Sequence, residues 1–131
     1  MKLTLLFLLI MSISNFSLKK TNSQIKTDTS ALIGKWHIDL SPQNTMDDNF
    51  AMMEITAING NNLKGTFYRE GVKIKDGQLN TQTGTIHAAL TSSDASGTYN
   101  TAFYFKDGML YGTTHSLARN FLSVWTATKS K

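Results

Sequence analysis

The chain has 131 residues, no cysteine and a formal net charge of +4. Three of its 13 basic residues and none of its 9 acidic residues precede Gln24, so the remainder holds 10 basic and 9 acidic residues and is almost neutral. The scattered charges give no support to nucleic-acid or anionic-membrane binding, and the absence of cysteine excludes disulfides, thiol nucleophiles and thiolate metal sites.

Residues 1–24 have the layout of a secretory signal peptide. Lys2 precedes an almost wholly apolar stretch, residues 3–13, and a polar stretch, residues 19–24, follows it. We therefore expect cleavage near Gln24 and a secreted or periplasmic protein that has no membrane contact afterwards. The rival interpretation is an uncleaved anchor, but the apolar stretch is shorter than the ~20 residues of a membrane-spanning helix. An exported domain without disulfides is more ordinary in bacteria than in eukaryotic secretion.

The remaining residues, 25–131, are enough for a single domain. Residues 25–30 are polar and predict a flexible lead-in. Beyond them apolar and polar residues alternate with a period of two, which is typical of half-buried strands. Asp76-Gly77 interrupts the fourth strand, and residues 78–80 either extend it beyond a bulge or begin a separate short piece. The predicted strands cover residues 34–40, 50–58, 63–68, 72–75, 85–91, 98–105, 109–115 and 121–128.

Short turn signals separate these strands, for example Asn59-Gly60 and Asp107-Gly108. Their spacing of about 8–12 residues is typical of an all-β barrel or sandwich. Because consecutive strands joined by short turns pair antiparallel, we expect an eight-stranded up-and-down β-barrel that the first and last strands close. An open two-sheet sandwich is the alternative, although no long crossover connection for a Greek key is visible.

Three segments carry a family likeness. The Gly-x-Trp motif at residues 34–36, followed by an antiparallel meander, resembles the opening of the calycin group, which comprises lipocalins, fatty-acid-binding proteins and avidins. Residues 65–68, Gly-Thr-Phe-Tyr, are similar to a second-hairpin segment of avidins, and Trp125 with the threonines after it is similar to their last strand. The resemblance implies a barrel that is closed near Trp36 and open at the other end.

The chain also departs from these families. Avidins line their biotin site with several further tryptophans, whereas this chain has 2 in all, and no biotin-contacting positions match. Lipocalins usually place an arginine in or after the last strand, whereas Arg119 precedes it. The resemblance therefore implies the architecture and not a particular ligand.

The ionisable residues give no pattern of catalysis or metal binding. Strand alternation places His37 and His87 on the solvent face, and no spacing gathers metal ligands around the histidines. His115-Ser116 could be combined with Asp107, but no Gly-x-Ser-x-Gly elbow is present, and adjacent strand residues face opposite ways. We expect no catalytic residue, no metal, no cofactor and no enzymatic activity.

A barrel of eight strands has a lumen that side chains either fill or leave open for one small ligand. The aromatic residues can be packing alone, and the polar segment 112–120 can be a solvated strand face and loop. We expect instead that the lumen binds a small, mainly apolar ligand whose polar end meets the hydroxyl, histidine and arginine side chains at the mouth. The candidate binding residues are Trp36, Phe67, Tyr99, Phe103, Tyr111, Thr113, His115, Arg119 and Trp125.

A protein-binding module is the alternative function. Small calycin-type barrels include metalloprotease inhibitors of similar length, in which the N-terminal segment enters the cleft of the enzyme. Residues 25–30 would be the corresponding segment of this chain. Those inhibitors carry a disulfide, which this chain lacks.

Overall fold

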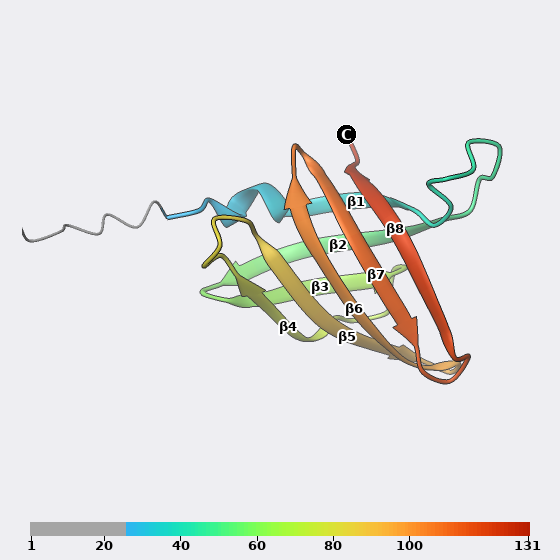
Figure 1. Cartoon of the computed structure of the whole chain (residues 1–131). Coiled ribbons are helices and arrows are strands. Elements are labelled where there is room, and N and C mark those ends of the chain that lie inside the picture. Colours follow the sequence, from blue (N-terminus) through green and yellow to red (C-terminus); the bar gives the residue numbers. More distant parts are fainter. Residues whose placement is uncertain (1–25) are drawn as a thin grey trace, which may run out of the picture.

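The computed structural model describes residues 26–131, so the predicted signal peptide and its cleavage site lie outside the described residues. Each strand runs antiparallel to the next, and the sheet closes on itself in chain order (Figure 1). No helix among residues 26–131 is long and apolar enough to cross a membrane. In chain order the elements are η1 (Thr29–Leu32), β1 (Gly34–Asp39), β2 (Phe50–Asn59), β3 (Asn62–Tyr68), β4 (Lys75–Asn80), β5 (His87–Asp94), β6 (Gly97–Lys106), β7 (Met109–Ser116) and β8 (Phe121–Lys129).

Pairing between β1 and β8 closes the barrel. Ile38 lies opposite Ala127, and Trp36 lies opposite Lys129. This closure removes both sheet edges, whose unpaired backbone groups would otherwise invite association with other chains. The predicted up-and-down eight-stranded barrel is therefore confirmed, and the alternative two-sheet sandwich is wrong.

The strand boundaries differ from the prediction in the middle of the chain. Residues 72–74 form a loop that touches β3 through one bridge, Thr66 to Lys73, and the fourth strand begins only at Lys75. The strand β5 continues to Asp94, three residues beyond its predicted end at Thr91. The register with β6 explains this extension, because Ser92 and Ser93 lie opposite Tyr99 and Thr98 and complete the ladder.

The lead-in also contains more structure than its polarity predicts. Thr29 and Ser30, the last two residues of the expected flexible segment, belong to the short 3-10 helix η1. The carboxylate of Asp28 caps this helix by accepting a hydrogen bond from the backbone N–H of Ser30 at 2.9 Å. An acidic side chain commonly satisfies an otherwise free donor at a helix start.

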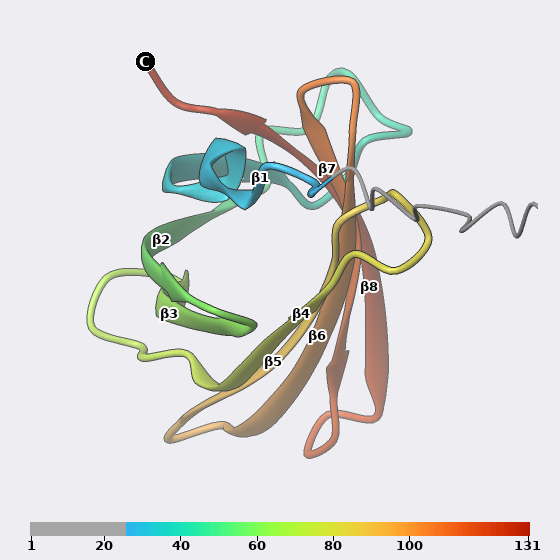
Figure 2. The same cartoon turned by 90° about the vertical axis from the view of Figure 1, so that its left-hand side faces the viewer.

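The short helix η1 lies at one end of the barrel (Figure 2), and its Leu32 belongs to the buried core. Leu32 and Ile38 are fully buried, and Trp36 is 1% exposed. The Trp36 ring meets Phe105 edge-on at 6.3 Å between centroids, and its indole N–H donates to the Leu32 carbonyl at 2.8 Å. Lys129 donates to the carbonyl of Ala31 at 2.8 Å. These contacts hold η1 against the barrel and close this end.

Candidate functional site

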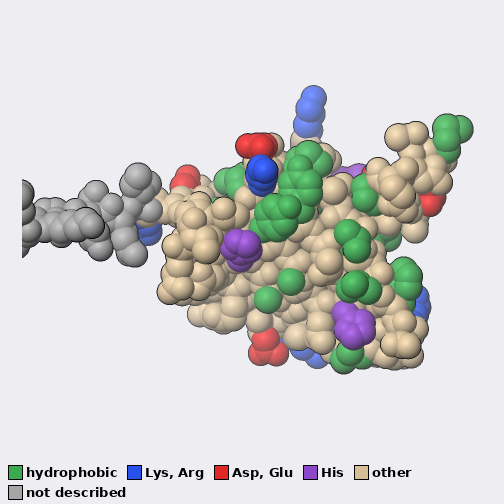
Figure 3. Space-filling view, viewed as in Figure 1, with side chains coloured by type: hydrophobic (Ala, Val, Ile, Leu, Met, Phe, Trp, Pro, Cys, Tyr) green, Lys and Arg blue, Asp and Glu red, His purple; other side chains and the backbone are tan. Residues whose placement is uncertain are grey.

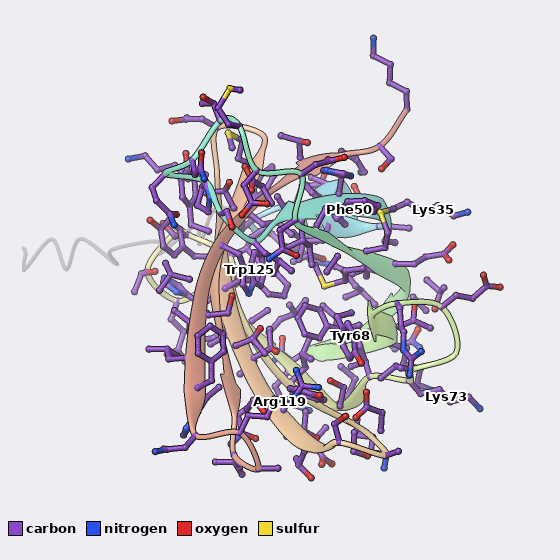
Figure 4. The ribbon with its side chains drawn as sticks, turned by 90° about the vertical axis from the view of Figure 1, so that its right-hand side faces the viewer. Lys35, Phe50, Tyr68, Lys73, Arg119 and Trp125 are labelled. Atoms are coloured by element: carbon purple, nitrogen blue, oxygen red, sulfur yellow. The ribbon has the colours of Figure 1, made fainter. Side chains whose placement is uncertain are left out.

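A cavity of about 320 Å³ opens at the other end of the barrel. Four loops meet there, since the β1–β2, β3–β4, β5–β6 and β7–β8 connections all lie at the same end of an up-and-down barrel. Figure 4 looks into this opening, which we call the mouth, and shows Tyr68, Arg119 and Trp125 around its interior. The residues that line the mouth are Leu40, Asn49, Ala51, Phe67, Tyr68, Tyr99, Thr114, Ser116, Arg119, Phe121 and Ser123.

Aromatic rings form one wall of the mouth and its floor. Tyr68 packs against Tyr99 at 5.4 Å and against Phe67 at 6.3 Å between ring centroids. Below them Trp125 contacts Phe67 and Phe103, each at 6.1 Å. Edge-to-face and tilted contacts of this kind position the rings as well as burying them. The wall is therefore a preformed apolar surface.

Trp125 takes its place because β7 has a glycine beside it. A Cβ atom at Gly112 would lie 2.3 Å from Cζ2 of the Trp125 ring, closer than any real contact. The indole N–H of Trp125 donates to Oγ1 of Thr114 at 3.0 Å, and this oxygen lies 3.0 Å from Oγ1 of Thr101. The floor of the mouth is thus fixed by packing on one side and by a hydrogen bond on the other.

Two serine hydroxyls near the mouth have no hydrogen-bond partner within the part of the chain that the structure describes. Ser116 is 5% exposed and lines the mouth, and Ser92 is fully buried opposite Tyr99 in the sheet. The side-chain oxygen of each serine lacks a partner among residues 26–131. A buried polar group left unpaired destabilises a fold by about 1–3 kcal/mol, so such groups call for an explanation.

Asp94 is the last residue of β5 and lies at the edge of the mouth, which we call the rim. Its carboxylate accepts hydrogen bonds from the phenol of Tyr68, from the phenol of Tyr99 at 3.4 Å and from the backbone N–H of Ser96 at 2.8 Å. The guanidinium of Arg69 lies 3.7 Å from the same carboxylate and 5.6 Å from the centre of the Tyr68 ring. The carboxylate of Asp94 therefore accepts three hydrogen bonds and forms one ion pair within the protein.

These contacts shift two pKa values in opposite directions. The hydrogen bond from Tyr68 lowers the pKa of the Asp94 carboxyl below its ordinary value, and the bonds from Ser96 and Tyr99 act in the same direction. The same hydrogen bond raises the pKa of the Tyr68 phenol, because ionisation would lose the bond and place two negative charges together. At neutral pH the pair is a carboxylate and a neutral phenol.

Arg119 reaches across the rim from the β7–β8 loop. One terminal nitrogen of its guanidinium donates to the hydroxyl of Ser96, in the β5–β6 turn, at 3.3 Å. Among residues 26–131 it forms no ion pair with a carboxylate. A guanidinium has five N–H donors, so Arg119 keeps further donors for a ligand.

The structure brings together some of the predicted binding residues and separates others. Phe67, Tyr99 and Arg119 line the mouth. Trp125 lies beneath this lining, in contact with Phe67 and Phe103, and the rings of Trp125 and Phe103 also line a second, larger groove. Trp36, the other predicted tryptophan, lies at the closed end of the barrel and does not line the mouth.

The prediction was wrong for Tyr111, Thr113 and His115, which lie on the outer face of β7. Strand alternation leaves the other set of residues inside, and Gly112 among them must face inward because it packs against Trp125. The side chains of Thr114 and Ser116 consequently line the mouth in place of their neighbours.

Tyr111 and Thr113 contribute instead to a groove of about 880 Å³ on the outside of the barrel. The groove crosses β4 to β8, and Tyr104 and Tyr111 stack along it at 5.2 Å. Figure 3 shows this face, with scattered hydrophobic side chains across its centre. Ala89, Ala102 and Val124 also line this groove, together with the buried Phe103 and Trp125 and with Pro42 of the β1–β2 loop.

The sequence analysis did not predict the hydroxyl-bearing residues of the mouth, although a pattern in the sequence indicates them. Each of β5 to β8 changes its inward-facing residues from apolar to hydroxyl-bearing toward the mouth, as in Gly112, Thr114 and Ser116 along β7. Small polar residues near a turn are typical of loops, which hid this pattern on β5. The residues missed were Tyr68, Ser92, Thr114, Ser116 and Ser123.

The ionisable residues do not gather into a metal centre in the part of the chain that the structure describes. Over residues 26–131, no group of three histidine, aspartate or glutamate side chains is placed to hold an ion. His37 and His87 are exposed, as the alternation predicts. The mouth is therefore a site of hydrogen-bonding and apolar groups, with Arg119 as the cation that lines it.

Comparison with known proteins gives no relative. No protein-family model matches the chain, and no curated protein or solved structure is significantly similar to it.

Proposed function

We propose that this protein is a small-molecule-binding β-barrel, which takes a small, mainly apolar ligand with one polar group into its mouth. The observation that carries the proposal is Ser116, which lines an aromatic-walled cavity and whose buried hydroxyl has no partner among residues 26–131. A ligand that hydrogen-bonds this hydroxyl would remove the penalty of leaving it unpaired. The adjacent rings of Phe67 and Tyr99 would then bury the apolar part of the ligand.

The size of the cavity suits this function. About 320 Å³ lies at the lower limit of typical small-molecule sites, which span roughly 300–1,000 Å³. Eight-stranded barrels are just wide enough for a single small ligand when their side chains do not fill the lumen. Here buried side chains such as Trp36 and Leu110 fill the closed end, so we expect the ligand to be short and to stay near the mouth.

The outer groove is larger, and it is the weaker candidate. Neither of the two unpartnered buried hydroxyls belongs to its lining. Several of its lining residues, such as Ala89 and Ala102, are ordinary outward-facing strand residues, and single exposed apolar residues are normal on a protein surface. The proposal therefore rests on the smaller and more enclosed cavity.

Intrinsic fluorescence can test the proposal because the chain has 2 tryptophans at different depths. A Trp36→Phe variant keeps Trp125, which contacts Phe67 of the mouth and also lines the outer groove, as the reporter, and a Trp125→Phe variant keeps the reporter at the closed end. Titration with a panel of small lipophilic compounds should give a saturable change in the first variant and a smaller change in the second. Absence of a saturable change with every compound would contradict the proposal.

Two neighbouring residues of β8 offer a matched control. Ser123 lines the mouth and Val124 lines the outer groove, so a phenylalanine at either position fills one cavity and leaves the other open. Binding should be lost in Ser123→Phe and retained in Val124→Phe, with circular dichroism showing that both fold. The reverse result would assign binding to the outer groove.

We also propose that binding takes place after export, as the sequence of residues 1–24 indicates. Mass determination of the chain purified from the periplasm or medium of an expressing bacterium tests this part. A mature N-terminus near residue 25 is the expected result, and a full-length cytoplasmic chain would contradict it.

A further inference from the structure

We infer that the ligand of the mouth is a monocarboxylate with a compact apolar body, whose carboxylate is bound by Arg119 and the Ser116 hydroxyl. This inference rests on the proposed function, because it names the class of ligand for the same cavity. Four observations lead to it: the charge of the lining, the free donors, the occupied donors and the character of the walls.

The charge of the lining favours an anion. Arg119 is a cation, and no aspartate or glutamate is among the residues that line the mouth. The nearby carboxylate of Asp94 already accepts bonds from two phenols and lies 3.7 Å from Arg69. Asp94 and Arg69 together are close to neutral, so the positive charge of Arg119 remains available to a ligand.

The donors that remain free point to the same class. The Ser116 hydroxyl has no partner among the described residues 26–131 and can donate to a ligand oxygen. Arg119 uses one N–H for Ser96 and presents the rest of its planar fork, which matches the two oxygens of a carboxylate. By contrast, the phenol protons of Tyr68 and Tyr99 are directed to Asp94, so these tyrosines offer a ligand only their rings and oxygen lone pairs.

The number of cations limits the charge of the ligand. A phosphate monoester carries about −1.5 to −2 charges at neutral pH and would need more than the single cation of the lining. A carboxylate carries one charge and is balanced by Arg119 alone. Since Phe67, Ala51 and Leu40 supply apolar surface on the remaining walls, the rest of the molecule is apolar and short.

Three probes of matched size separate these classes: phenylacetate, phenylacetamide and benzyl phosphate. Calorimetric titration of the wild-type protein at neutral pH and low salt should show phenylacetate binding about tenfold more tightly than phenylacetamide, as charge-assisted hydrogen bonds predict. Benzyl phosphate should bind more weakly than phenylacetate. The naphthyl counterparts of the three compounds test a larger apolar body.

Substitution of the cation tests its role directly. Arg119→Gln should reduce the preference for carboxylate over amide to within about twofold, and Arg119→Lys should restore part of it because the charge returns without the planar fork. Lys73→Gln is the matched control, since Lys73 is an exposed cation of the β3–β4 loop that does not line the mouth. This variant should keep the preference.

The outcomes distinguish the inference from the proposed function. Equal binding of the acid and the amide, or tighter binding of the phosphate, would overturn the inference and leave a ligand-binding mouth in place. A carboxylate preference that survives in Arg119→Gln would also overturn it. If no compound of any series binds in a saturable manner up to its solubility, both the inference and the proposed function are wrong.

Discussion

The two ends of this barrel are built from the same strands and have opposite properties. At the closed end the inward side chains are apolar, and the polar atoms of Trp36 and Lys129 both reach backbone carbonyls of η1. At the mouth the same strands turn inward hydroxyls, and those of Ser92 and Ser116 have no partner within the described chain. The comparison teaches that one end is optimised for stability, whereas the other retains unsatisfied capacity for hydrogen bonding.

The contrast between paired and unpaired polar groups therefore runs along individual strands rather than between one strand and another. On β7, Leu110 is fully buried toward the closed end, whereas Ser116 ends the strand at the mouth with a free hydroxyl. Unsatisfied groups cluster at functional sites because a ligand can satisfy them. Substitutions at the two ends should accordingly differ in the sign of their effect on stability.

The largest effect is expected from Trp36→Ala at the closed end. It removes a buried ring, the edge contact to Phe105 and the hydrogen bond to η1. Loss of a large buried aromatic side chain lowers the free energy of unfolding by about 3–5 kcal/mol. Urea denaturation followed by circular dichroism measures this change. A loss below about 1 kcal/mol would contradict the view that this end supports the fold.

A smaller loss is expected from Gly112→Ala, at the boundary between the two ends. The new methyl group would lie 2.3 Å from the Trp125 ring, so the indole must shift from its position. Overpacking of this kind lowers stability by about 1–3 kcal/mol. Ligand binding should weaken as well, since the floor of the mouth shifts. Gly60→Ala, which has no atom within 4 Å of the added carbon but a φ of 60°, separates the strain of the backbone from the collision with the ring.

Thr114 and Ser116 on β7 allow a paired hydroxyl to be compared with one on the same strand that is unpaired within residues 26–131. Thr114→Val removes the acceptor for the Trp125 indole N–H and should cost about 1–3 kcal/mol of stability. Ser116→Ala removes an unpartnered hydroxyl, so stability should stay the same or rise by up to about 1 kcal/mol, while ligand binding weakens. Thermal denaturation and ligand titration of both variants measure the two effects. A clear loss of stability in ligand-free Ser116→Ala would show that the hydroxyl has a structural partner.

The smallest effect concerns the pH dependence of the rim. The lowered pKa of Asp94 contributes stability above the ordinary carboxyl pKa, and this contribution is lost as pH falls through the lowered value. The raised pKa of Tyr68 contributes stability below the ordinary phenol pKa, and this contribution is lost as pH rises through the raised value. The difference in stability between wild type and Asp94→Asn should therefore be steady around neutrality and shrink in acid. A difference that grows in acid would contradict the assigned contacts.

The architecture could be predicted because it depends on local patterns. Alternation in residues such as Trp36 and Ile38, together with short turns, leaves few ways to protect the edges of an eight-stranded sheet. Closure by β1 and β8 follows from that constraint without any knowledge of the register. The filling of the closed end by buried side chains likewise agrees with the position of Trp36 at the start of the first strand.

The site was harder to predict because it depends on the phase of each strand and on its last residues. A shift of one residue in the predicted alternation moves all side chains of a strand to the other face. On β7 such a shift led to the prediction of Thr113 instead of Thr114. On β7 both faces mix polar and apolar residues, so the sequence pattern does not fix the phase. The β5 extension to Asp94 depends on pairing with Tyr99, a contact between strands that local propensity does not reveal.

Crystallographic soaking with a library of small fragments tests the central claim most directly. It reports where ligands bind without assuming their identity, and it samples the mouth and the outer groove in one experiment. We predict that fragments collect in the mouth, with an apolar ring against Phe67 and Tyr99 and a polar atom within hydrogen-bond distance of the Ser116 hydroxyl. Fragments that bind only along the outer groove, or none in the mouth, would contradict the account.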